Sequence, residues 1–245
     1  MVTTINPSDQ TITQYTVQVG GASNLLASVG PGSAGQMLQS AGNASNPAYS
    51  TATYPATAGS LGNVLTSNGT NFVSQGGGWT LIQTQTVSGS PASINFTTLS
   101  SNYNVFVLVI NNFVKSATAS NFTYLQFSSD GGANYISSGY QSGLFVNAYN
   151  SGVVNNVNDT AGILLDNQQG GGTSVLCETV WIYNMNISQI PQVYGTYVGN
   201  APAASPFIGW LGGAYQTATA MNALRVNVAA GTMTSGNISL YGISK

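Results

Sequence analysis

The chain has 245 residues, of which only 3% are charged, and it contains no histidine. Its three basic residues are scattered and cannot neutralise a row of phosphates, which argues against nucleic acid as a partner. The longest apolar run, VFVLVI at 105–110, is far shorter than the roughly 20 residues that span a bilayer, which argues against membrane insertion.

Residues 1–78 carry an internal repeat. Residues 32–43 read GSAGQMLQSAGN, residues 59–70 read GSLGNVLTSNGT, and a fainter copy occupies residues 24–30. The shared core is an amide, two apolar residues, any residue, serine, any residue and glycine. The second apolar position is a leucine in every copy, and these residues are Leu26, Leu38 and Leu65.

A repeat of this size is too small to bury its own apolar pair, so it needs neighbours along the chain or from other chains. The unequal spacing of the copies argues against a self-sufficient solenoid. We therefore expect a slender shaft, in which several identical chains wind around one axis and Leu26, Leu38 and Leu65 line that axis. The alternative is a low-complexity linker, but a linker has no reason to keep leucine in register.

A flexible joint, Gln75-Gly76-Gly77-Gly78, separates this region from residues 79–245. β-forming residues dominate throughout, and no segment shows a helical stripe, so the chain is expected to be all-β. Alternation predicts strands at 79–87, 103–110, 121–127, 174–185, 191–198, 223–228 and 237–243. Many short strands at short intervals indicate a head domain that is a jelly-roll-like β-sandwich.

Two of these segments carry further information. Residues 103–110 are apolar on both faces, which places them in the middle of a sandwich or against a partner subunit. Residues 121–127 run towards Asp130-Gly131, a strong signal for a tight turn between two strands. Asp130 is expected to bond the backbone of that turn.

No catalytic, metal or cofactor site is predicted, because the commonest general base and metal ligand, histidine, is absent. Asp159 and Asp166 are expected to be isolated, solvated acids rather than ligands of calcium or a glycan. Asp166 and Glu178 leave a glycosidase pair open, which would need a defined separation, but their surroundings do not argue for it. Cys177 is expected to be a buried, unreactive thiol in the apolar run SVLCETVWIY.

With no catalytic or metal site predicted, the remaining function is the binding of a partner through surface shape and neutral polar groups. Tyrosine and tryptophan supply broad, rigid contact area, and asparagine, serine and glycine adjust hydrogen bonds around them. The stretches 134–149 and 194–215 combine these residue types. Most of their rings are expected in the core or in subunit contacts, whereas Tyr140, Tyr149 and Tyr215 are the candidates for exposed, receptor-binding residues.

The segments GSAGQMLQSAGNASNPAYS and GSLGNVLTSNGTNF resemble the G-x-x-G-x-[VL]-L-x-S-x-G units of bacteriophage tail-fibre and related virion fibre proteins. Residues 93–97, 103–108, 125–132 and 238–242 resemble pieces of the β-sandwich heads of the same proteins. Each motif is short, but together they cover most of the chain.

This resemblance implies a homotrimer on the virion surface, part of a tail, collar or capsid appendage. Its N-terminal region, 1–78, would be an anchor and shaft that docks to other virion proteins. Its head, 79–245, would attach the particle to the host surface, with surface polysaccharide as a receptor to test. The short shaft favours a stubby spike, collar fibre or capsid decoration over a long fibre.

Two other functions stay open. The first is a capsid or collar decoration, or head fibre, with a purely architectural role. The second is a cellular adhesin or surface-layer subunit, which the absence of a visible secretion signal in MVTTINPSDQ disfavours. An enzyme is not expected.

Overall fold

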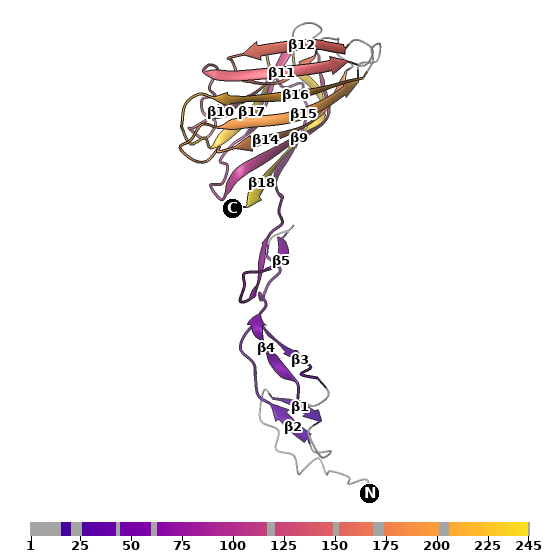
Figure 1. Ribbon diagram of the computed structural model, residues 1–245, viewed down its shortest axis with the longest axis vertical. Helices are drawn as coiled ribbons and strands as arrows, with labels where there is room; N and C mark the ends of the chain where they lie inside the picture. The colour runs from indigo at the N-terminus through magenta and orange to yellow at the C-terminus, as the bar shows by residue number, and fades with distance from the viewer. Residues whose placement is uncertain are drawn as a thin grey trace. The chain divides into compact units, whose positions relative to one another are not determined.

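The computed structural model (Figure 1) describes residues 16–20, 26–42, 45–59, 63–116, 121–148, 152–168, 174–200 and 206–244. These residues form eighteen strands and no helix, so the prediction of an all-β chain is confirmed for the described part. The chain divides into two compact units, Met1–Gly77 and Gly78–Lys245. The roles of anchor, shaft and head stay predictions.

The first unit consists of antiparallel β-hairpins. They pair β1 (Val17–Gly20) with β2 (Leu26–Val29), β3 (Gln36–Gln39) with β4 (Ala48–Thr53), and β5 (Asn63–Ser67) with β6 (Phe72–Gly76). Each copy of the sequence repeat supplies one strand of one hairpin. The fainter copy forms the second strand of its hairpin, whereas the two clear copies form the first strand of theirs. The repeats therefore fold as hairpins rather than as an irregular linker.

The conserved serine and glycine of the repeat turn the chain at the end of β3 and β5. The Ser40 hydroxyl oxygen accepts a hydrogen bond from the Gly42 N–H at 3.3 Å, and Ser67 accepts one from Gly69 at 3.2 Å. Gly42 has φ of 94° and Gly69 has φ of 92°, in a region that favours glycine. The Ser-x-Gly pattern is thus a turn signal, repeated because the turn is repeated.

The conserved amide of the repeat ties each hairpin together. Gln36 Nε2 donates to the Ser50 carbonyl at 2.6 Å, and Asn63 Nδ2 donates to Ser74 Oγ at 3.0 Å. Both bonds run from the first strand of a hairpin to its second strand, although one acceptor is a backbone carbonyl and the other a serine hydroxyl. Amide, serine and glycine therefore have a structural role inside one chain, and the leucine is the repeated residue whose role remains to be explained.

Contacts within the first unit also link its second and third hairpins. The Tyr54 and Phe72 rings stack with centroids 4.7 Å apart and an interplanar angle of 17°. The Thr53 N–H donates to Asn71 Oδ1 at 2.8 Å. Stacking and this bond fix β4 against the start of β6.

The second unit is a β-sandwich of two antiparallel sheets. The eight-stranded sheet has the order β12 (Gly152–Asp159), β11 (Tyr140–Ala148), β16 (Phe207–Tyr215), β15 (Gln192–Asn200), β14 (Val175–Tyr183), β9 (Tyr103–Lys115), β18 (Met233–Ser244) and β7 (Thr80–Thr86). The four-stranded sheet has the order β13 (Ile163–Gln168), β10 (Asn121–Ser128), β17 (Ala223–Val228) and β8 (Ser93–Phe96). Figure 1 shows the large sheet from β12 to β18 across the head.

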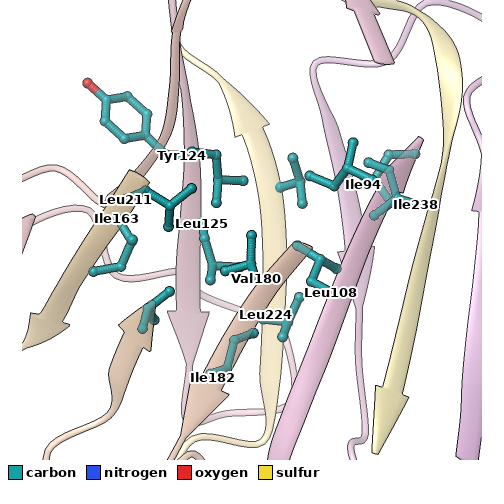
Figure 2. Close-up of a cluster of buried hydrophobic side chains, with 14 of the residues drawn as sticks. Ile94, Leu108, Tyr124, Leu125, Ile163, Val180, Ile182, Leu211, Leu224 and Ile238 are labelled. Carbon is teal, nitrogen blue, oxygen red and sulfur yellow. The ribbon is translucent and has the colours of Figure 1, made fainter. Parts of the chain in front are cut away.

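The core of this unit lies between the two sheets. Figure 2 shows side chains of the large sheet, such as Leu108 and Val180, beside those of the small sheet, such as Leu125 and Leu224. These four side chains have no exposed surface. Burial on this scale gives the head a hydrophobic core of its own.

Every strand predicted from alternation is present. The central one, β9, extends to Lys115 and lies between β14 and β18. It is apolar on both faces because Phe106, Leu108 and Ile110 belong to the core and Val107, on the opposite face, is fully buried as well. The turn predicted at Asp130-Gly131 is present, but it does not join two strands that pair with each other. β10 pairs with β13 and β17, and the chain then crosses to β11 of the other sheet.

This turn is part of a longer loop between β10 and β11, and Asp130 organises the loop. Its carboxylate accepts hydrogen bonds from the Ser128 hydroxyl at 2.6 Å and the Asn134 N–H at 2.9 Å. These bonds lower the pKa of Asp130 to about 2. The expected role of Asp130 in bonding its own loop is therefore confirmed.

Candidate functional site

The side of the eight-stranded sheet that faces away from the four-stranded sheet is called the outer face. Alternation along β14 and β15 buries every second residue against the core and leaves the others on this face. The outer face carries the large side chains Leu81, Phe145, Trp181, Tyr194, Val198, Ile208, Trp210 and Tyr241.

Trp79 packs on the outer face against two other rings. Its ring centroid lies 5.3 Å from that of Trp181 in an edge-on arrangement, and 5.8 Å from that of Tyr241. Val107 lies between Trp181 and Tyr241 in the strand register and is fully buried. Trp79 itself stays about half exposed. The cluster shields the middle of the face and still presents an aromatic surface.

A second pair of rings lies further along the sheet. Trp210 on β16 and Phe145 on β11 are direct cross-strand partners, with ring centroids 5.4 Å apart. Trp210 is 43% exposed. Tyr194, the cross-strand partner of Trp181, is about half exposed as well. The three tryptophans of the chain thus all lie on one face.

A shallow groove of 290 Å³ runs across β9, β14 and β15. On the outer face it is lined by Val109, Asn111, Cys177, Thr179, Thr196 and Val198. The Cys177 thiol donates to Asn111 Oδ1 at 3.2 Å. The expectation of a buried Cys177 is wrong, because alternation in β14 turns it to the outer face, where it is half-buried.

No charged residue of the described ranges lies on the outer face. Those residues lie inside the sandwich, in the loop after β10, at the end of β12 or on the small sheet, and they are Lys115, Asp166, Glu178, Asp130, Asp159 and Arg225. A contiguous, uncharged surface with exposed rings is the kind of surface that binds a partner.

The prediction that Tyr140 is an exposed residue is wrong. Tyr140 begins β11 and is 1% exposed. Its hydroxyl oxygen accepts a hydrogen bond from the Phe127 N–H at 2.8 Å, and its ring lies 5.2 Å from that of Tyr215. Burial raises the pKa of Tyr140. The preceding Gly139 suggested a loop, but the tyrosine bridges the two sheets instead.

The other two tyrosines of that prediction have different outcomes. Tyr215 ends β16, is partly buried, and packs on Tyr140. Tyr149 lies outside the described residues. Tyr140 and Tyr215 are therefore in contact, with Tyr140 in the core and Tyr215 partly buried against it. Receptor contact by Tyr215 stays a prediction.

Two of the repeat leucines are exposed in the single chain. Leu38 on β3 is 39% exposed and Leu65 on β5 is 53% exposed. Leu26 begins β2, and its side chain lies outside what the structure describes. Contact of these leucines with sister subunits stays a prediction, but Leu38 and Leu65 have apolar surface left for such contact.

Three ionisable residues gather inside the sandwich. Lys115 Nζ lies 2.5 Å from Asp166 Oδ1, and both side chains are 1% exposed. Glu178 is buried too. The expectation of a solvated Asp166 is wrong, because β13 turns this residue into the core. Asp166 and Glu178 are brought together, but their burial leaves no access for a glycan chain.

A neighbouring glycine or asparagine predicts a loop, whereas the exposed rings of the outer face, such as Tyr194 and Trp210, lie on strands. The signal for the outer face was present in strands that are apolar on both sides. In β14, Val180 and Ile182 face the core while Trp181 and Tyr183 face outward. Residues 103–110, in the neighbouring strand β9, show the same double-sided pattern.

No protein-family model matches the chain, and neither a curated protein nor a solved structure matches it. Within the described residues, no group of three or more potential metal ligands gathers. That part of the chain also holds no helix long and apolar enough to cross a membrane.

Proposed function

We propose that the protein is a structural fibre or spike protein of a bacteriophage virion, a trimer that attaches the particle to the host surface through its head. The observation that carries this proposal is the leucine at one fixed repeat position. Leu38 and Leu65 lie on equivalent hairpin strands and leave 39% and 53% of their surface in water. The single chain leaves this apolar surface uncovered at both levels, whereas an assembly would bury it.

The trimer, the docking of residues 1–78 to other virion proteins and the jelly-roll classification of the head are parts of the same proposal. Strands β7 to β11 alternate between the large and the small sheet, which supports the jelly-roll type. Three heads on one shaft would gain avidity even if each binds weakly.

The uncharged outer face supports attachment to a neutral surface polysaccharide. Exposed rings such as Trp210 and Tyr194 offer flat apolar area, and the hydroxyls of Thr179 and Thr196 lie nearby in the groove. Rings with polar neighbours suit a ligand that has both apolar and hydroxyl-bearing faces.

An architectural role as a capsid or collar decoration is the second candidate. It is favoured by the aliphatic residues of the same face, since Leu81, Val198 and Ile208 are each about half exposed. Aliphatic side chains do not stack on sugar rings, and they pack well against another protein surface. In this case the outer face would bind neighbouring virion subunits.

The decisive experiment measures the solution mass of the full-length protein and its binding to a panel of bacterial surface polysaccharides and to capsids. Trp210→Ala is the test variant, and Ile190→Ala is the control. Ile190 is exposed to a similar extent, 38% against 43%, but lies in the loop between β14 and β15. Saccharide binding that only Trp210→Ala abolishes supports attachment. Binding to capsids alone favours decoration, and a monomeric full-length chain rejects the proposal.

A further inference from the structure

Lys115 and Asp166 meet inside the head from opposite sheets. Lys115 ends β9 of the large sheet, and Asp166 lies on β13 of the small sheet. The Lys115 Nζ to Asp166 Oδ1 distance is 2.5 Å, shorter than an ordinary hydrogen bond, and the ammonium group also lies 3.3 Å from Thr123 Oγ1. The amine nitrogen is thus held against a carboxyl group in a site closed to water.

Glu178 is the third member of this cluster, on β14 of the large sheet. Among the described residues neither of its carboxyl oxygens has a hydrogen-bond partner. Burial raises the pKa of Glu178 well above its ordinary value, the Asp166 charge raises it further, and the Lys115 charge lowers it. The raised pKa favours the protonated, neutral form of Glu178, and its carboxyl group interacts electrostatically with both partners of the ion pair.

Burying three ionisable side chains is expected to destabilise the fold, which suggests that the cluster has a function. The chain has three basic and five acidic residues, and three of these eight charged residues are buried in one place. A buried ion pair is often no more stable than apolar side chains of the same volume, and an unpartnered buried carboxyl group is destabilising. A group of ionisable residues buried in an otherwise apolar core therefore indicates a reactive site.

We propose that Lys115 and Asp166 become joined by an intramolecular isopeptide bond, with Glu178 as the group that transfers protons. The three residues supply what amide formation requires: an amine, a carboxyl group in contact with it, and a neighbouring acid. No bound cofactor is needed.

The reaction balances without any other reactant. In the apolar interior the ion pair neutralises when a proton passes from Lys115 Nζ to the Asp166 carboxylate, because a low dielectric disfavours separated charges. The Nζ lone pair attacks Asp166 Cγ, and the Nζ–Cγ bond forms. Glu178 takes a proton from the nitrogen and gives one to the departing oxygen. The Cγ–O bond breaks, one water leaves, and Glu178 returns to its starting state.

The product is a covalent link between the two sheets of the sandwich. The chain has a single cysteine, so no disulfide can supply such a link. An amide between β9 and β13 resists reduction, and it ties together two segments that are 51 positions apart. Closing a loop of that length also restricts the unfolded chain.

The full-length protein, purified and then denatured, provides the first test. Its intact mass is expected to be lower than the sequence mass by one water. Trypsin cleaves after Lys115 and Arg225 if both side chains are free. Linkage of Lys115 should leave residues 1–225 in one piece, also lighter by one water, instead of separate fragments 1–115 and 116–225.

This digest separates the isopeptide bond from another water loss. A succinimide at Asp130-Gly131 would also remove one water, but it would leave Lys115 open to trypsin. Wild-type protein that folds, keeps its full mass and is cleaved at Lys115 overturns the proposal. A lighter protein that is nevertheless cleaved into separate fragments at Lys115 overturns it as well.

Variants then test the assigned roles. Asp166→Ala removes the carboxyl partner, and Glu178→Gln keeps the volume but removes the proton carrier. Both are expected to show full mass and cleavage at Lys115. Asp159→Asn is the matched control, because Asp159 bonds Tyr124 rather than Lys115, and it should stay linked. A folded Glu178→Gln protein that is still linked would rule out the role of Glu178. If either variant fails to fold, the wild-type digest alone decides whether the bond exists.

Discussion

Replacing Leu38 and Leu65 by serine should dissociate the assembly while the chain stays folded. The exposed parts of the two side chains, 39% and 53%, together equal roughly one leucine. Complete burial of a leucine contributes about 1.5–3 kcal/mol. If subunit contact buries these parts, each chain loses about 2 kcal/mol of association energy and a trimer about 6 kcal/mol, a change of about four orders of magnitude in the association constant.

The assay is sedimentation equilibrium of the full-length protein over a dilution series, with wild type and the double serine variant side by side. Met37→Ser together with Val64→Ser is the matched control. These residues precede Leu38 and Leu65 on the same strands, point to the opposite faces, and are 50% and 47% exposed. The control should keep the oligomeric mass of the wild type.

Three results would refute the reasoning. A double serine variant with unchanged association would show that the leucines are not in the interface. Equal dissociation of the Met37 and Val64 control would show that any exposed apolar residue matters, rather than the repeated one. A wild-type monomer throughout the dilution series would show that the shaft does not exist.

Two further predictions concern the stability of the head. Gly209→Ala should lower the free energy of unfolding, measured by urea titration, by about 1–3 kcal/mol, because a Cβ there would lie 2.2 Å from the Tyr197 ring. Gly212→Ala on the same strand is the control. The nearest atom to a Cβ there is 3.5 Å away, so this change should have little effect on the free energy of unfolding. Glu178→Gln should remove a pH dependence, because burial raises the native pKa of Glu178 while the unfolded chain ionises near the ordinary value of 4.5. Wild-type stability should therefore fall as the pH rises from 4.5 towards the native pKa, by up to about 1.4 kcal/mol per pH unit. The free energy of unfolding is measured by urea titration at a series of pH values from below 4.5 upwards. An equal pH dependence for wild type and Glu178→Gln would contradict a raised pKa of Glu178.

The sequence by itself determined the local structure of this protein. Alternation in 103–110 and 223–228 is enough to predict strands, because side chains of a strand point to opposite faces at a period of two. The repeat is visible as a pattern because its serine and glycine make the same turn bond in successive hairpins, and its amide bonds the partner strand in both. Interactions between residues close in sequence produce sequence patterns, and these can be recognised without a structure.

Only the tertiary structure decided which strands are neighbours and what each face meets. Asp130-Gly131 indicates a turn, but a turn does not show that the next strand joins the other sheet. Tyr140 follows a glycine, yet its ring lies in the core. Lys115, Asp166 and Glu178 are far apart in the chain, and pairing between distant strands brings them together. Alternation fixes which residues share a face, while burial of that face depends on the layer that covers it.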